Sequence, residues 1–202
     1  MIYRKRKVNM MSLRQKLINI IYRIATGNKK VKILLTPIGP IFVFTLIGVL
    51  IIISLQMDKF LKLPKLLPAS LNIIVSAPIL AIGLFLMVWS NLHFLKAKGT
   101  PVPLNPPPKL VTTGPYAYVR NPMVTGGFII LFGLGILLNS VSLTFIFTPI
   151  LILLAVLELK IIEEPELEKR LGKEYIEYKK RIPMFIPEAS LPLWKRGDEK
   201  NL

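Results

Sequence analysis

The sequence predicts an all-α integral membrane protein with about four transmembrane helices, and three observations predict it. Four long, almost wholly apolar runs are separated by polar connections, at residues 38–55, 71–90, 123–138 and 141–159. Because a helix rises ~1.5 Å per residue, ~20 apolar residues can cross the hydrocarbon layer of a bilayer. Most of the 17 prolines fall in the connections, where irregular backbone is tolerated. In addition, 52% of the 202 residues are hydrophobic, more than a soluble domain usually carries.

Charge is unevenly distributed along the chain, whose formal net charge is +16. Ten Lys and Arg residues and no acidic residue precede the first apolar run. This bias is typical of a segment that stays on the cytoplasmic side of a membrane and meets anionic lipid. Four spans return the chain to the side where it started. We therefore expect both termini to be cytoplasmic and the protein to lie in the cell membrane.

Two residue types that often carry chemistry are nearly missing from this chain. It has no cysteine, which excludes disulfides, thiolate metal sites and a cysteine nucleophile. Its single histidine, His93, excludes a multi-histidine metal site. We therefore expect no metal centre, and acid–base chemistry is left to Glu, Tyr, Lys, Arg or a bound group.

Residues 1–32 form a basic segment with a helical pattern. One face carries Leu13, Leu17, Ile20, Ile21 and Ile24, and the other carries Arg14, Lys16, Asn19 and Arg23. Ser12 and Gln15 predict a capping box at the start, and Gly27 predicts the stop. We expect an amphipathic helix in the cytoplasmic interface, held by apolar burial and by anionic membrane lipid at ~1 kcal/mol per basic residue. A nucleic-acid arm and a solvated basic tail are less favoured, so no nucleic acid is expected as a partner.

Residues 33–95 hold the first two predicted spans, 38–55 and 71–90. The connection 56–68 carries fewer basic residues than the N-terminal segment, so we assign it to the outer side. Pro78 predicts a kink in the second span, because proline leaves a helical carbonyl without its donor. At the cytoplasmic end, the lone His93 is more often an interfacial residue than a catalyst.

Residues 96–187 begin with a polar connector, 96–122, that is rich in Pro and Gly. Two apolar runs follow, 123–138 and 141–159, separated by so few residues that only a tight hairpin can join them. The first run is ~24 Å long at ~1.5 Å per residue, which is short for a ~30 Å core and leaves thinning or re-entry open. Its glycines favour close helix contact over a nucleotide-binding loop.

After the hairpin the composition changes to mixed charge with helical spacing. One face carries Leu167, Leu171, Tyr175, Tyr178 and Ile182. Gly172 predicts a break into two helices, and Pro183 and Pro187 end the pattern. We expect cytosolic C-terminal helices followed by a loose tail, residues 188–202.

Two polar clusters are expected to meet at one membrane surface, one before the hairpin and one after it. Asn121 and Pro122 predict a helix start whose free N–H groups suit a carboxylate or phosphate. Glu163 and Glu164 can accept from an ammonium or hydroxyl group, and nearby prolines and tyrosines offer flat walls for a ring. The clusters thus predict a pocket for a zwitterionic ligand with an aromatic base. A structural role is equally open, in which Arg120 reaches lipid headgroups and the glutamates end a helix.

Several motifs in the second half of the chain occur in a recognisable order. They are Gly99-Thr-Pro-Val-Pro103, Lys109-Leu-Val-Thr-Thr-Gly-Pro-Tyr-Ala-Tyr-Val-Arg-Asn-Pro-Met123, Glu163-Glu-Pro-Glu-Leu167, Leu171-Gly-Lys-Glu-Tyr175, Tyr178 and Arg181-Ile-Pro183. Together they resemble the isoprenylcysteine carboxyl methyltransferase and phospholipid methyltransferase superfamily. The resemblance covers about half of the chain, from Lys98 to Pro187.

The resemblance implies an integral membrane enzyme that uses S-adenosylmethionine. The cofactor would be held on the cytosolic side by the C-terminal half, and a lipidic or prenylated acceptor would enter from the bilayer. The family's cofactor contacts correspond to Leu110, Val111, Gly114, Pro115, Tyr116, Val119, Arg120, Asn121, Pro122, Glu163 and Glu164. Many members have histidine in place of Asn121 and tyrosine in place of Val124, so a ring contact to the cofactor is lost or replaced by an amide.

Methyl transfer from a sulfonium is an in-line displacement that needs alignment and exclusion of water more than a strong base. A carboxylate acceptor needs no deprotonation, whereas an ammonium acceptor must lose a proton, for which Glu164 and Tyr178 are the candidates. Arg120 and Arg181 are the candidates for holding an acceptor carboxylate or phosphate. The sequence leaves the methyl acceptor and the oligomeric state open.

Two other functions stay open from the sequence. Membrane reductases of the sterol-reductase type carry a similar Arg-His-Pro element and use a nicotinamide cofactor, although the compact Glu163-Glu-Pro165 motif disfavours them. A noncatalytic scaffold that gathers anionic lipid with its N-terminal helix belongs to a different class. Binding of S-adenosylhomocysteine or of a reduced nicotinamide would separate the three.

Overall fold

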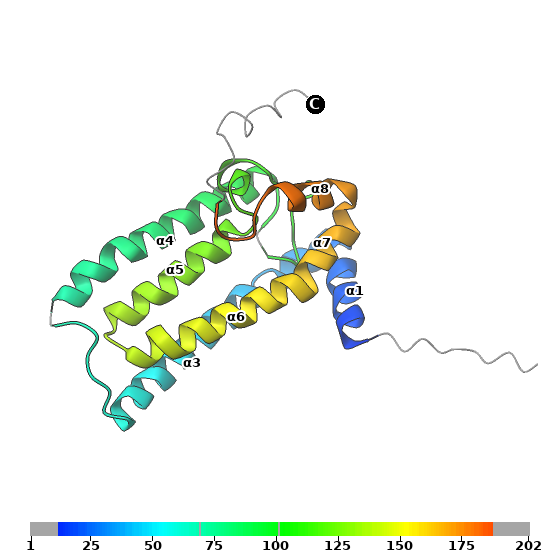
Figure 1. The fold of residues 1–202 in the computed structure, drawn as a ribbon. Helices are drawn as coiled ribbons and strands as arrows, with labels where there is room; N and C mark the ends of the chain where they lie inside the picture. Colours follow the sequence, from blue (N-terminus) through cyan, green and yellow to red (C-terminus); the bar gives the residue numbers. More distant parts are fainter. Residues whose placement is uncertain (1–11, 69, 101, 188–202) are drawn as a thin grey trace, which may run out of the picture.

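A computed structural model of the protein describes residues 12–68, 70–100 and 102–187. Every regular element in these ranges is a helix, which confirms the predicted all-α class. Figure 1 shows the long helices running side by side. Helices α1, α7 and α8 gather at one end of the bundle, together with the connector that precedes α5, and the chain reversals after α3 and α5 lie at the other.

The N-terminal segment folds into two short helices, α1 (Leu13–Ala25) and α2 (Lys29–Leu35). The predicted capping box is present at the start of α1. Ser12 Oγ accepts from the Gln15 backbone N–H, and the Gln15 side chain accepts from the Ser12 N–H. Helix α1 ends just before the predicted stop at Gly27. The sequence therefore located this helix, and its place at a membrane surface stays a prediction.

Three helical stretches are long and apolar enough to cross a membrane: Lys29–Phe60, Leu71–Lys96 and Leu143–Leu171. The first includes α3 (Ile38–Phe60), and the second is α4, which continues through Pro78. The third is one unbroken run of η2 (Leu143–Phe147), α6 (Thr148–Glu158), η3 (Leu159–Glu163) and α7 (Glu164–Leu171), in which η2 and η3 are π-helical.

The predicted count of four spans is not confirmed. Helix α5 (Pro122–Leu137) has 16 residues, fewer than the ~20 that a straight span needs. The sequence already showed this run to be short, since it is bounded by Pro122 and by the polar residues Asn139 and Ser140. The described residues therefore provide three helices of spanning length and one shorter apolar helix.

Helices α4 and α5 pack closely because glycines at their contact leave room for the neighbouring backbone. A Cβ atom at Gly126 would lie 2.7 Å from Gly83 O, and one at Gly83 would lie 2.9 Å from Gly126 O. A Cβ at Gly133 would lie 2.7 Å from the Leu80 side chain. Any larger residue would push the helices apart. The glycines thus bring α5 against the middle of α4, and close helix contact at these glycines is what the sequence favoured.

The end of the bundle away from α7 is closed by side chains that satisfy backbone groups. The Asn139 amide donates to Leu67 O and accepts from Leu67 N–H, both at 2.9 Å. Asp58 accepts from the Ser142 N–H at 2.9 Å and from the Ser140 hydroxyl. A carboxylate at a helix start satisfies free N–H groups and opposes the positive end of the helix dipole. The tight turn between the two apolar runs is therefore a fixed corner.

The C-terminal helices are separated where the sequence predicted. Gly172 has a φ of +63°, a value that favours glycine, and it divides α7 from α8 (Lys173–Arg181). The segment after α8 returns to the start of α5, where Arg120 N–H donates to Pro183 O at 2.9 Å and the next N–H donates to Met184 O at 3.2 Å. These bonds bring α8 beside the connector.

Candidate functional site

A pocket opens where the connector, the start of α5, α7 and α8 meet. It holds about 860 Å³ of empty space, its open mouth included. Its lining residues are Phe94, Thr100, Val102, Pro103, Pro106, Pro107, Lys109, Leu110, Val111, Tyr116, Arg120, Asn121, Met123, Val124, Glu163, Glu166, Leu167, Arg170, Leu171, Tyr175 and Tyr178. The lining combines apolar, proline-rich residues of the connector with charged and aromatic residues, most of them from the helices.

The connector keeps its irregular path through close backbone contacts. A Cβ at Gly99 would lie 2.2 Å from Pro107 N, so the loop closes only because this residue is glycine. The Thr100 N–H and hydroxyl both donate to Asn105 O, at 2.9 and 3.0 Å. Arg170 of α7 reaches the same loop, with Nη1 donating to Pro107 O at 3.5 Å. The proline-rich segment is therefore an ordered wall attached to α7.

The connector enters the site at Gly114, the first residue of η1 (Gly114–Ala117). Gly114 has a φ of +63°, and a Cβ there would lie 2.2 Å from His93 Nε2. His93 Nδ1 lies 2.9 Å from Trp89 O, a distance that suits the tautomer with its proton on Nδ1. His93 thus packs against the connector and does not line this pocket, and its interfacial role stays a prediction.

Tyr116 and Tyr178 join η1 to α8 inside the pocket wall. The Tyr178 hydroxyl donates to Tyr116 O at 2.7 Å, and the Tyr116 ring meets Phe94 edge to face at 5.0 Å between centroids. Both tyrosines are about 5% exposed. Burial raises the pKa of each phenol above its ordinary value of 10.0. Tyr178 is therefore neutral at physiological pH and directs its proton to a carbonyl, which suits positioning better than accepting a proton.

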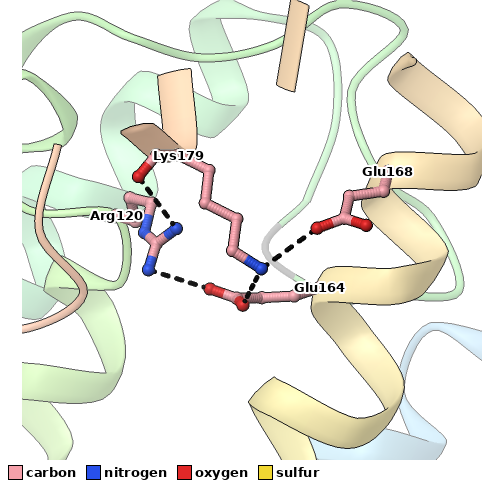
Figure 2. Close-up of polar contacts among 4 residues, drawn as sticks. All are labelled: Arg120, Glu164, Glu168 and Lys179. Atoms are coloured by element: carbon pink, nitrogen blue, oxygen red, sulfur yellow. Dashed lines mark hydrogen bonds and ion pairs between the residues drawn. The ribbon is translucent and has the colours of Figure 1, made fainter. Parts of the chain in front are cut away.

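Arg120 is the basic group at the centre of the site, and its side chain is 10% exposed. Nη2 forms an ion pair with Glu164 Oε1 at 3.0 Å, and Nη1 donates to Lys179 O at 3.4 Å (Figure 2). Among the described residues, the buried Nε has no hydrogen-bond partner. A buried guanidinium N–H without an acceptor is costly, so it is a natural donor for a bound anionic group.

Glu164 sits between two cations. Its side chain is 6% exposed, and Oε2 lies 2.6 Å from Lys179 Nζ, which in turn lies 3.0 Å from Glu168 Oε1 (Figure 2). Hydrogen bonding to Glu164 raises the pKa of Lys179, so this cation stays charged. Each oxygen of Glu164 thus lies within ion-pair distance of a cation, although Oε1 makes no hydrogen bond among the described residues, and the residue does not line the pocket.

Asn121 and Pro122 begin α5 as predicted, with Asn121 at the N-cap position and proline at the first helical position. The Asn121 side chain makes no capping hydrogen bond to the helix, and the residue lines the pocket. The backbone carbonyl of Asn121 accepts from the Thr125 hydroxyl at 2.9 Å. Pro122 is buried in the wall. The amide is therefore available to a ligand rather than to the helix end.

One face of the helix after the hairpin lines the pocket with charged groups. Glu163, Glu166 and Arg170 recur at spacings of three and four. Glu166 is 1% exposed, and Arg170 Nε donates to Glu166 Oε1 at 2.9 Å. The neighbouring face carries Glu164 and Glu168, four residues apart, and points to Lys179. Glu163 and Glu164, which are adjacent in the sequence motif, therefore lie on different faces of the helix.

The structure brings together the two polar clusters that the sequence placed at one surface. Seven of the expected site residues line the pocket: Leu110, Val111, Tyr116, Arg120, Asn121, Glu163 and Tyr178. Six others do not line it: Gly114, Pro115, Val119, Pro122, Glu164 and Arg181. Gly114, Pro115, Val119 and Pro122 form the backbone around it, Glu164 supports Arg120, and Arg181 is exposed at the end of α8.

Sequence reasoning missed several charged lining residues. Glu166 and Arg170 lie three and seven positions after Glu163, so helical spacing could have found them. Tyr175 was placed on the correct face but not in the site. Lys179, which holds Glu164, carried no signal, because nothing in the sequence shows that α8 turns back against Arg120.

Fold and site together define a helical membrane protein with a small-molecule pocket at one end of its bundle. A model of the phospholipid methyltransferase family matches residues 71–174, about half of the chain, and the protein belongs to that family of membrane methyltransferases. The match runs from α4 to the start of α8 and includes the connector and most of the pocket lining. The resemblance seen in the sequence is confirmed.

A curated relative is the nickel-cobalt-cadmium resistance protein NccN of Alcaligenes xylosoxydans xylosoxydans. It is 29% identical over 124 residues, which cover 58% of this chain and 54% of the relative. The chain thus spans about half the length of that protein. Among the described residues no group of three or more His, Asp or Glu side chains is arranged to hold a metal ion.

Proposed function

We propose that the protein transfers a methyl group from S-adenosylmethionine to a lipidic or prenylated acceptor at the cytosolic face of the cell membrane. The family supports methyl transfer. The observation that supports the choice of cofactor is the buried Nε of the lining residue Arg120, which has no hydrogen-bond partner among the described residues. Asn121 and Glu163 line the same pocket, so donor and acceptor groups are both present for a zwitterion.

The residues present fit such a cofactor by their chemistry. Its amino-acid part carries a carboxylate, suited to Arg120 and Asn121, and an ammonium, suited to Glu163. The adenine ring needs a flat apolar wall, which Pro106 and Leu110 provide. When bound, the cofactor supplies an activated methyl group on a sulfonium. The chain's own residues then have to orient the two reactants and exclude water.

The structure changes how the catalytic candidates are weighed. Glu164 is held by Arg120 and Lys179, and the Tyr178 hydroxyl donates to a carbonyl, so neither is placed to take a proton. Glu163 lines the pocket and is our candidate to receive the proton of an ammonium acceptor at a carboxylate oxygen. An acceptor carboxylate would need no such group, so both acceptor classes fit the proposal.

The orientation follows from charge. The basic N-terminal segment favours the cytoplasmic side, and α1 lies at the same end of the bundle as α7 and α8 (Figure 1), which contribute residues to the pocket lining. We therefore place the pocket and both termini at the cytosolic face, with the acceptor entering from the bilayer. The name of the relative NccN refers to metal resistance, and our proposal rests on the family and the pocket instead.

The test is cofactor binding by the purified full-length protein in detergent. S-adenosylhomocysteine is expected to bind saturably and at least ~10-fold more weakly to Arg120→Ala and Glu163→Ala. Lys65→Ala, at the far end of the bundle, is the control and should bind normally. Tight binding of a reduced nicotinamide without S-adenosylhomocysteine would instead support the reductase, and binding of neither would support the scaffold. Transfer of labelled methyl groups to membrane lipids and prenylated thiols then identifies the acceptor.

A further inference from the structure

We propose that α1 binds the surface of an anionic bilayer and, through its contacts with η3 and α7, stabilises the helix face that forms the pocket. Anionic lipid would then act as an activator at a distance from the pocket. The membrane-binding part stands on α1 alone, whereas the effect on cofactor affinity rests on the proposed function.

The outer face of α1 is an exposed apolar stripe. Leu13, Leu17 and Ile20 are spaced four and three residues apart, which puts them on one side of the helix. Their exposed fractions are 79%, 50% and 53%. An apolar stripe of this exposure on a basic helix is the pattern of a segment that lies in a membrane interface.

Charge identifies the kind of membrane. Lys16 and Arg23, seven residues apart, form an exposed basic row beside the stripe. The first acidic residue of the chain is Asp58, so the row has no acidic competitor nearby in the sequence. Basic residues at a bilayer surface are attracted to anionic headgroups while the apolar stripe enters the acyl boundary. Nucleic acid would satisfy the charge but leave the stripe in water.

The opposite side of α1 is attached to the helix that carries the pocket face. Arg14 Nε donates to Ile161 O at 2.9 Å. Lys169 Nζ donates to Asn19 Oδ1 at 2.6 Å and lies 4.3 Å from the centre of the Tyr22 ring. Helix α1 thus presents its apolar stripe on one side and contacts η3 and α7 with the other.

The residues of η3 and α7 that contact α1 are close in sequence to residues that line the pocket. Ile161 belongs to η3, the π-helical turn that ends at the lining residue Glu163, and π-helical turns are less regular than α-helix. Lys169 immediately precedes Arg170 and Leu171, which also line the pocket. When lipid immobilises α1, the contacts hold η3 and α7, and a pocket that needs less ordering binds its ligand more tightly.

The experiment compares the full-length protein in vesicles of phosphatidylcholine alone and of phosphatidylcholine with phosphatidylglycerol. Hydrogen exchange of residues 164–171 is expected to slow on the order of 5-fold in the anionic vesicles, and affinity for S-adenosylhomocysteine to rise by about the same factor. Lys16→Gln with Arg23→Gln should abolish both responses. Lys59→Gln with Lys65→Gln removes the same charge at the far end of the bundle and should leave both intact.

A second variant separates membrane binding from coupling. Lys169→Met removes the contacts with Asn19 and Tyr22 and leaves the basic row unchanged. A dye on Leu13→Cys, the sole thiol in this chain, should still report insertion of α1 in anionic vesicles, while the exchange response of α7 is lost.

Three outcomes would overturn the proposal: no change of exchange in α7 on adding phosphatidylglycerol, equal loss in both charge variants, or a response that follows the protein-to-lipid ratio, which would assign the stripe to a second copy of the chain. An exchange response without any binding of S-adenosylhomocysteine would support the surface and reject the cofactor.

Discussion

Glu164 gives the sharpest test of how the site is held together. Glu164→Gln keeps the shape of the side chain and removes its charge, so Arg120 and Lys179 lose a shared partner at 3.0 and 2.6 Å. The matched change is Glu168→Gln, because Glu168 pairs with the same Lys179 at 3.0 Å but is 39% exposed. The two variants remove one carboxylate each from a single cluster.

The expected costs differ because burial differs. An ion pair at ~4 Å is worth ~4 kcal/mol at an effective dielectric constant of ~20, and part of this is offset by desolvation. Breaking a buried pair costs ~3–5 kcal/mol, and we expect ~3 kcal/mol for Glu164→Gln because Lys179 keeps Glu168. For Glu168→Gln we expect ~0–1 kcal/mol, as for other exposed pairs. At ~2–4 °C per kcal/mol, the unfolding midpoint should fall by ~6–12 °C and by less than ~4 °C, respectively.

The assay is thermal unfolding of both variants in one detergent, followed by far-UV circular dichroism. The double variant Glu164→Gln with Arg120→Gln is included, because it removes both members of the buried pair. We expect it to be less destabilised than the sum of the single variants, with a coupling of about 1–3 kcal/mol. Equal midpoints for the Glu164 and Glu168 variants, or a strictly additive double variant, would refute the argument from burial.

Three further predictions concern packing, pH and the far end of the bundle. Gly126→Ala should destabilise the protein by ~1–3 kcal/mol, because its Cβ would press on a carbonyl of α4. The control is Gly127→Ala, whose Cβ would have nothing within 4 Å and which should be neutral or stabilise the protein by up to ~1 kcal/mol. Denaturant unfolding of the two variants compares these free energies. Burial raises the pKa of Tyr178 above 10.0. The stabilisation of the folded state by the neutral Tyr178 phenol is therefore complete below pH ~10, and it is lost as the pH rises through the folded-state pKa. Tyr178→Phe should therefore cost ~1 kcal/mol at pH 8 and flatten the fall of the unfolding midpoint in more alkaline buffer; an unchanged slope would contradict this. Asp58→Ala should cost ~1–3 kcal/mol by leaving the Ser142 N–H unsatisfied, without changing the affinity for S-adenosylhomocysteine; weakened binding in a folded variant would contradict the separation of the two ends.

Much of the fold could be predicted because it follows from local rules. Hydrophobic runs located the long helices, and the capping box at Ser12 and the break at Gly172 fixed boundaries to within a residue or two. These signals depend only on residues near one another in the sequence. The number of spans was harder to predict. A run of 16 apolar residues is shorter than a typical span and longer than many buried helices, so tertiary packing decides whether it crosses the membrane.

The site was predictable in position but not in detail. The sequence placed Arg120 and Glu164 near each other, because both follow from the hairpin that joins their helices, and the structure pairs them at 3.0 Å. It could not place Lys179, since its contact depends on the turn of α8 against the connector through the backbone bonds of Pro183. Contacts of this kind are set by the path of the chain and leave no pattern in composition or spacing.

The neighbouring glutamates show why a sequence motif does not assign roles by itself. Successive residues of a helix point ~100° apart, so neighbouring glutamates need not contact the same groups. In the structure Glu163 lines the pocket, whereas Glu164 pairs with Arg120. One turn later, Glu166 lines the pocket and Glu168 pairs with Lys179. A carboxylate that is saturated by two cations stabilises the donor it holds, whereas one that faces the cavity can meet a ligand. Loss of binding on removing Glu164 would thus report the position of Arg120, and loss on removing Glu163 would report the ligand contact itself.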